Sequence, residues 1–124
     1  MNPQLEDIRK AIFAARLPAS VESKMQAAIA ERLTTAGIPH VRELNLPKIG
    51  RIDFAAETSQ GYAGFECKTH SKPMEAARQL HRYGQSGKFA VLVLITARPY
   101  TLPISHVQHG SRMIPVLQWQ IPAL

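Results

Sequence analysis

The sequence predicts an α/β protein with a central sheet of mixed strand direction and flanking helices. Segments with strand-like composition alternate along the chain with segments of helical periodicity, as in α/β sheets. The run from Phe89 to Ile95 is almost wholly apolar, as expected of a central strand that is covered on both faces. With 124 residues, of which 45% are apolar, we expect a single domain, residues 1–124, that can bury a core.

The first predicted helix covers residues 2–16. Its apolar side chains recur at helical spacing and fall on one side, namely Leu5, Ile8, Ile12 and Phe13. We interpret this helix as an addition to the core that serves packing or dimerisation, so a homodimer is one expected assembly.

The second predicted helix covers residues 20–36. Ser20 is a suitable N-cap, and Gly37 is a suitable residue just after the helix end. At about 100° per residue, one face gathers the apolar side chains that we expect to point into the core. These are Met25, Ile29, Leu33 and Ala36.

Two acids on this second helix point to different sides of it. Glu22 falls within roughly 20° of Ile29 on the helical wheel, whereas Glu31 falls nearly opposite and should be solvated. Burying an acid is costly unless it is paired, protonated or bound to a metal ion. Glu22 therefore either points inward at a functional site or lies in the wet first turn, where the helix dipole favours it.

Three strands are expected next. Residues 41–46 and 49–56 form a predicted hairpin, and residues 62–68 form the third strand. Consecutive strands usually pair, so Asp53 could stand beside Glu66. Glu66 and Lys68 share a strand face by alternation, which would gather two acids and one base on one patch of sheet. The Cys67 thiol should point to the opposite, packed face.

A third helix should begin with Pro73 at its first position and run to about residue 85. Gln79 and Tyr83 are four residues apart and would lie on the same side of it. After the apolar strand, residues 103–109 suggest a short helical turn. Residues 113–120 suggest an edge strand that contains Trp119.

Asp53, twelve intervening residues and then Glu66-Cys67-Lys68 make a pattern that is similar to the D…(D/E)-x-K signature of the PD-(D/E)xK nuclease superfamily. Restriction endonucleases, Holliday-junction resolvases and RecB-type exonucleases belong to it. The expected order of helix, three strands, helix and strand over residues 20–96 also resembles this superfamily, although Ile52 replaces the usual proline. The resemblance implies a restriction-endonuclease-like αβα sandwich around a mixed sheet of four to five strands.

The resemblance also implies a Mg²⁺-dependent deoxyribonuclease, with Mn²⁺ able to replace Mg²⁺. Lys68 would orient or deprotonate a water molecule, or stabilise charge in the transition state. Gln79 and Tyr83 resemble the Q-x-x-x-Y motif of RecB-type nucleases, which helps to hold the active site and the DNA strand. The implied metal ligands are Asp53, Glu66, the backbone carbonyl of Cys67 and Glu22.

The charge balance favours an anionic partner. The net charge is +6 and the sequence pI is about 9.9, which fits DNA as the partner. The single cysteine excludes an internal disulfide framework and suits the cytoplasm. The apolar runs are too short for a membrane span, and we recognise no signal peptide. The basic residues expected to contact phosphates are Arg51, Lys72, Arg78, Arg82 and Lys88.

Three functions are compatible with these observations. The first is a small nuclease that acts in repair, recombination or phage DNA processing. The second is a nuclease-like fold that only binds nucleic acid or assembles with partners. The third is an unrelated basic α/β module in which the acid–lysine pattern is a coincidence. The joint presence of Asp53, Glu66 and Lys68 favours the first.

Overall fold

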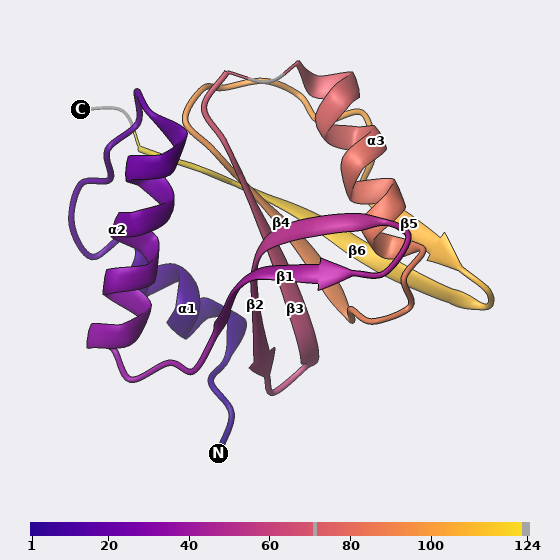
Figure 1. The fold of residues 1–124 in the computed structure, drawn as a ribbon, viewed down its shortest axis with the longest axis horizontal. Helices are drawn as coiled ribbons and strands as arrows, with labels where there is room; N and C mark the ends of the chain where they lie inside the picture. Colours follow the sequence, from indigo (N-terminus) through magenta and orange to yellow (C-terminus); the bar gives the residue numbers. More distant parts are fainter. Residues whose placement is uncertain (71, 123–124) are drawn as a thin grey trace.

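The computed structural model describes residues 1–70 and 72–122. Within these ranges the chain forms three helices and six strands, which makes it a mixed α/β protein (Figure 1). No helix in the described ranges is long and apolar enough to cross a membrane. The elements are α1 (Leu5–Ile12), α2 (Glu22–Thr35), β1 (Val41–Leu46), β2 (Gly50–Thr58), β3 (Gly61–Lys68), α3 (Pro73–Gly84), β4 (Val91–Thr96), β5 (His106–His109) and β6 (Arg112–Gln120).

The six strands form one sheet in the order β1-β2-β3-β4-β6-β5. β1, β2 and β3 pair antiparallel, β3, β4 and β6 pair parallel, and β5 returns antiparallel to β6. Every residue of β4 is buried, which confirms the central strand predicted from its apolar run. The predicted sheet of four to five strands is too small, because β5 adds an outer strand and makes β6 an inner one.

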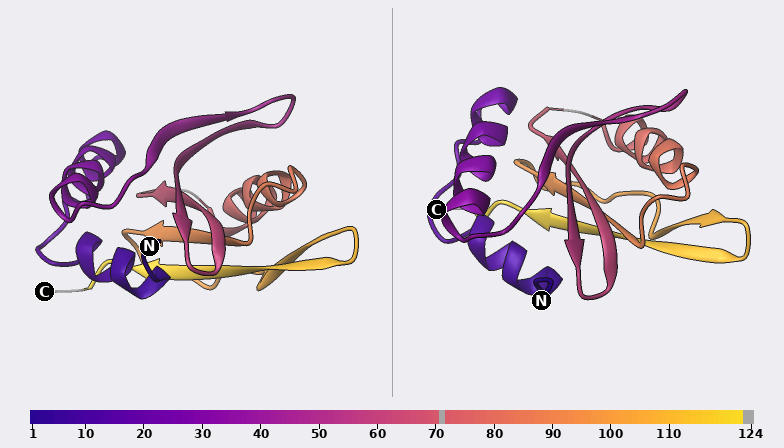
Figure 2. Two further views of the ribbon diagram at one scale, coloured as in Figure 1. Left: turned by 90° about the horizontal axis from the view of Figure 1, so that it is seen from below. Right: turned by 60° about the horizontal axis from the view of Figure 1, so that its bottom comes forward.

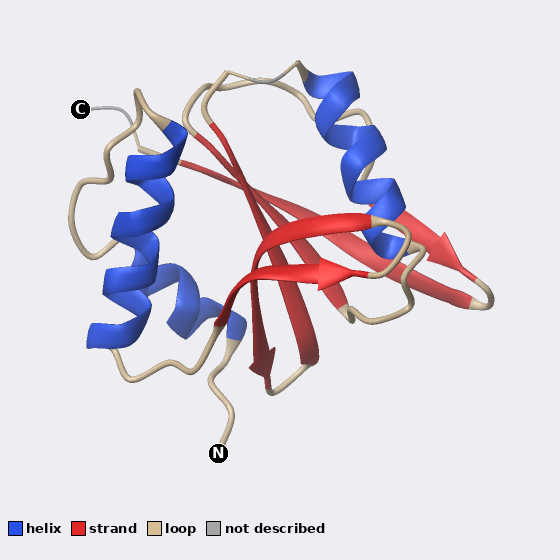
Figure 3. Cartoon of the chain, in the orientation of Figure 1, coloured by secondary structure: helices blue, strands red, loops and turns tan. Residues whose placement is uncertain are grey.

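Helices cover both faces of the sheet (Figure 3). α1 and α2 pack on one face, around a core that includes Phe54, Phe65 and Cys67. α3 packs on the other face, around a core that includes Leu80 and Leu92. The sheet therefore stands between two apolar layers, as an α/β/α arrangement requires.

The α2 helix ends as its sequence predicts. Gly37 adopts a φ of 71°, which glycine reaches without steric cost. The Gly37 amide donates to the Thr34 carbonyl and the Ile38 amide donates to the Leu33 carbonyl, as in a Schellman motif. The start of α2 differs from prediction, because Val21 rather than Ser20 occupies the N-cap position and makes no side-chain cap.

The expected helical faces are largely correct. Met25, Ile29 and Leu33 of α2 are buried, whereas Ala36 is exposed at the helix end. α1 is shorter than the predicted helix over residues 2–16, because a capping box at Gln4 sets its start. Beyond its end, the Arg32 guanidinium donates to the carbonyls of Ile12, Ala15 and Arg16 and holds a non-helical chain.

The predicted helical turn over residues 103–109 is wrong. Residues His106–His109 form β5, and Val107 packs on the α3 side of the sheet. The segment is extended because it pairs with β6, a long-range contact that has little local signature.

Candidate functional site

The strand ladder opens at Asp53. The β2–β3 ladder runs from the Phe54–Phe65 pair to the Thr58–Gly61 pair, so it stops one step before Asp53 would face Glu66. The β1–β2 ladder pairs residues on both sides of Asp53, and Glu43 opposite it has a φ of 51°. A left-handed conformation at a glutamate is uncommon and distorts the strand locally. The backbone around Asp53 is thus freed from regular pairing.

Side chains replace the missing ladder bonds. The Asp53 carboxylate accepts a hydrogen bond from the Cys67 amide at 2.8 Å. The Glu66 carboxylate accepts one from the Asp53 amide at 3.2 Å. The second Glu66 oxygen lies 3.3 Å from the Lys68 amine. The structure therefore brings together the two acids and the lysine that the sequence singled out.

The way in which the acids meet differs from simple strand alternation. Ile52 and Ala55 both pack on the α3 side, while Phe54 packs on the α2 side. Residues three apart on a regular strand point to opposite faces, so the alternation breaks between positions 52 and 55. Asp53 lies at this break, between the two strands, rather than on a flat patch beside Glu66.

Burial and mutual repulsion dominate the electrostatics. Burial, followed by the charge of Asp53, raises the pKa of Glu66 to about 8. Burial also raises the pKa of Asp53, and the nearby charge of Glu22 raises it further. Lys68 and the amide hydrogen bonds lower both pKa values but do not cancel the effect of burial. Two close acids share a single nearby ammonium group, an arrangement that an added cation would relieve.

The structure places Glu22 near this cluster and Glu31 away from it. Glu22 is half-buried in the first turn of α2, and its charge raises the pKa of both Asp53 and Cys67. Glu22 thus lies in the first turn and close enough to act on the cluster through its charge, and its role at a functional site stays a prediction. Glu31 is exposed.

Gln26 is a site residue that the sequence reasoning missed. It lies one turn after Glu22, and a hydrogen-bonding interaction of its side chain lowers the pKa of Asp53. The i, i+4 spacing from Glu22 was the available signal.

Cys67 contributes its backbone amide, whereas its carbonyl as a metal ligand stays a prediction. The thiol is fully buried in the α2-side core, as predicted, and burial raises its pKa well above the ordinary value. Its amide holds the Asp53 carboxylate.

Gln79 and Tyr83 connect α3 to the strand that carries Asp53. The Gln79 amide donates to the Tyr83 hydroxyl at 2.7 Å, and that hydroxyl donates to the Arg51 carbonyl at 2.9 Å. Burial, and next the charge of Glu66, raise the pKa of Tyr83. This chain of hydrogen bonds ends two residues before Asp53, so it positions the acid-bearing part of β2.

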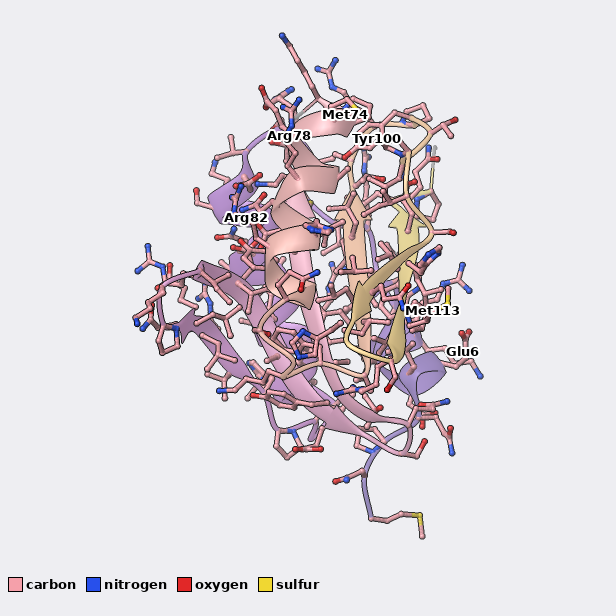
Figure 4. All side chains as sticks on the ribbon, turned by 90° about the vertical axis from the view of Figure 1, so that its right-hand side faces the viewer. Glu6, Met74, Arg78, Arg82, Tyr100 and Met113 are labelled. Carbon is pink, nitrogen blue, oxygen red and sulfur yellow. The ribbon has the colours of Figure 1, made fainter. Side chains whose placement is uncertain are left out.

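A groove of about 350 Å³ runs from Lys68 along α3. Its charged lining contains Arg78 and Arg82, which lie one helical turn apart on α3 (Figure 4), and one acid, Glu75. A larger cavity of about 440 Å³ lies near the N-terminus and the start of β1, away from the paired acids. The groove beside Lys68 is therefore the one connected with the site.

The other predicted phosphate-binding residues are spread more widely. Arg51 is exposed on β2, and Lys72 is exposed at the N-cap of α3. Lys88 precedes β4, whose first residue pairs with Ala63, so it lies at the opposite end of β4 from Lys68. Arg78 and Arg82 line the groove beside Lys68, and Arg51 lies two residues before Asp53 on β2, whereas Lys88 lies away from the site.

The oxygen donors suit a hard cation with few protein ligands. In residues 1–70 and 72–122, no group of three or more His, Cys, Asp or Glu side chains is arranged to hold a metal ion, so Glu22 does not complete a trio with Asp53 and Glu66. Mg²⁺ typically binds one or two carboxylates and keeps several waters. Two close carboxylates, one of them buried with a raised pKa, fit that requirement.

Comparison with known proteins gives one distant likeness. Models of known families do not match this chain, and neither do curated protein sequences. Among solved structures, SfsA of Pyrococcus furiosus in complex with Ca²⁺ aligns at 17% identity and a TM-score of 0.38. The alignment covers 77% of this chain and 51% of SfsA, so this chain spans about half the length of that protein. A likeness at this level carries no conclusion about function.

Proposed function

We propose that this protein is a Mg²⁺-dependent nuclease with a restriction-endonuclease-like core, which hydrolyses phosphodiester bonds of DNA. The observation that carries the proposal is the convergence of Asp53, Glu66 and Lys68 where the β2–β3 ladder opens. These are the residues that match the D…(D/E)-x-K signature. The net charge of +6 supports an anionic substrate.

Asp53 and Glu66 would hold the metal ion. Once bound, Mg²⁺ would acidify a water ligand and offset the negative charge that develops on the phosphate. Glu22 lies close enough to act on Asp53 through its charge, and it would act on the ion through a water molecule. Burial helps here, because a low local dielectric strengthens the attraction between carboxylates and a cation.

Lys68 would act on the reacting groups directly. Its side chain is 17% exposed and lies between the buried Glu66 and the groove, so its amine can face both. It would orient or deprotonate the attacking water, or stabilise charge on the phosphate. Tyr83 and Gln79 would hold β2 in place, and Arg78 and Arg82 would bind phosphates next to the one that is cleaved.

The test is cleavage by the wild type and by Lys68→Ala. Supercoiled plasmid and a four-way junction are incubated with Mg²⁺ or Mn²⁺, and binding is measured separately in Ca²⁺ by gel shift. Lys68→Ala should reduce cleavage by about 10²–10⁴-fold. Its DNA binding should remain largely intact, because one phosphate contact among many is lost. Thermal unfolding checks that the variant is folded.

Lys10→Ala is the matched control. Lys10 is exposed on α1, on the opposite face of the sheet from α3, so its loss should leave cleavage unchanged. Equal cleavage by the wild type and Lys68→Ala would place the active site elsewhere or reveal a contaminant.

A second function has one observation in its favour. The described residues do not gather three metal-ligating side chains, which suits a module that binds nucleic acid without cutting it. DNA binding without metal-dependent cleavage of either substrate would support that module and overturn the nuclease.

A further inference from the structure

The tip of the β1–β2 hairpin holds a lysine in a costly conformation. Lys48 is exposed and has a φ of 66°, in the left-handed region where glycine and asparagine are the usual residues. A long cationic side chain gives the turn no conformational advantage. A strained residue of this kind is a reason to look for a function at that position.

The hairpin tip is held against α3. Leu46, just before the turn, is buried in the α3-side core together with Leu80 and Tyr83. Just after the turn, the Arg51 carbonyl accepts the Tyr83 hydroxyl at 2.9 Å. Figures 1 and 2 show the tip beside α3 in all three views. Lys48 therefore projects from a turn that is fixed relative to the groove along α3.

Exposed cations continue from the groove to this tip. The groove beside Lys68 carries Arg78 and Arg82, and Arg51 and Lys48 are exposed on the hairpin, whose Arg51 carbonyl is bonded to Tyr83 of α3. Ion pairs among the described residues join Arg9 to Glu6 and Lys68 to Glu66. The remaining four cations of this series have no acidic partner in the described part of the chain, and Glu75 is the acid in the groove lining.

We infer that these residues form one track for the phosphate backbone of a DNA strand, with the hairpin tip as its outer contact. The track runs from Lys68 past Arg78 and Arg82 to Arg51 and Lys48. Arg78 and Arg82 are about 6 Å apart along the helix axis. This is close to the axial advance of two nucleotide steps, about 7 Å, in one strand of B-DNA. The inference rests on the proposed function and deepens it, because it assigns DNA contacts beyond the residues that line the groove.

Lys48→Gly separates a binding role from a structural one. Glycine adopts the left-handed conformation without steric cost, so the turn is kept and the thermal midpoint should stay unchanged or rise. Affinity for a labelled 20-nucleotide duplex and for its single strand, measured by anisotropy in Ca²⁺, should fall about three- to tenfold at low salt. The slope of log affinity against log salt should become shallower by about 0.7–0.9.

Two further variants complete the experiment. Lys48→Arg should keep the affinity, and Lys10→Ala on the opposite face should match the wild type. If the wild type binds DNA and Lys48→Gly binds equally well with the same salt slope, the hairpin contact is refuted while the nuclease proposal stands. If Lys48→Gly loses binding but the wild type does not cleave, the track stands and the nuclease proposal is refuted.

Discussion

Glu66 is an acid in an environment that disfavours its charged form. It is 3% exposed, and burial together with Asp53 raises its pKa to about 8. Burial and the charge of Asp53 therefore favour the protonated form of this carboxyl in the metal-free protein, although the Lys68 amine is 3.3 Å away. A site that opposes its own negative charge gains most from a bound cation.

This residue should make the stability of the metal-free protein depend on pH. The pKa of Glu66 in the folded protein, about 8, lies above its ordinary value of 4.5. The folded state binds this proton more tightly, so the free energy of unfolding falls as the pH rises from about 4.5 to about 8. Over this range the free energy of unfolding falls by at most about 1.4 kcal/mol for each pH unit.

Glu66→Gln should flatten that dependence. Glutamine keeps an oxygen that can accept the Asp53 amide, but it does not titrate. Urea unfolding in EDTA at pH 5.5, 7 and 8.5 measures the difference. An equally steep dependence in Glu66→Gln would show that other groups cause it.

At the scale of elements, one hydroxyl connects α3 to β2. The Tyr83 hydroxyl accepts from Gln79 and donates to the Arg51 carbonyl, and its ring is buried. The Tyr100 hydroxyl is the opposite case, because it is buried and has no hydrogen-bond partner among the described residues. The two tyrosines therefore form a natural comparison.

Tyr83→Phe should lower the free energy of unfolding by about 0.5–1.5 kcal/mol, because it removes the part-buried hydrogen bonds to the Gln79 amide and the Arg51 carbonyl. Tyr100→Phe should be neutral or stabilising, since it removes a polar group that is already unsatisfied. Chemical denaturation of both variants beside the wild type measures this. Equal losses in the two variants would mean that the Tyr83 hydrogen bonds contribute nothing specific.

Local sequence signals predicted most elements. Pro73 at the first position of α3, Gly37 after α2 and the apolar run of β4 each act through local geometry or burial, and each is confirmed. β5 was missed because Val107 is its single buried residue, so the segment has little strand pattern. Its conformation comes from pairing with β6.

At the scale of the whole molecule, one sheet joins two apolar cores. The single tryptophan, Trp119, packs against Phe65 and Phe13 in the core under α1 and α2. Leu80 is fully buried in the core under α3. Because both cores pack on the same strands, loss of packing on one face should also lower the stability of the other face.

Leu80→Ala should therefore shift the unfolding transition seen by Trp119 fluorescence. The expected loss is about 2–5 kcal/mol, typical of a leucine removed from a packed core. Far-UV circular dichroism should give the same midpoint, as in two-state unfolding of one domain. Leu117→Ala, at an exposed position of β6, should cost less than about 0.5 kcal/mol. If Leu80→Ala left the unfolding midpoint measured by Trp119 fluorescence unchanged, the two faces would unfold separately.

The candidate site was predictable as a set of residues but not as a geometry. Hairpin order and the acid–lysine spacing indicated that Asp53, Glu66 and Lys68 meet. Strand alternation could not place Asp53, because the pattern breaks between Ile52 and Ala55. Such a break depends on how three strands bend together, which the spacing of residues along one strand does not encode.

The hydrogen bonds at the open ladder also affect how this sequence can drift during evolution. Asp53 and Glu66 accept strand amides, so selection for folding alone would keep an acid or an amide at both positions. Lys68 contributes its amine to Glu66 and to the groove, and under the proposed nuclease function its retention would depend on selection for cleavage rather than for folding. If the proposed nuclease function is lost in a descendant, position 68 should therefore change before the two acids do, because the acids also hold the strands together.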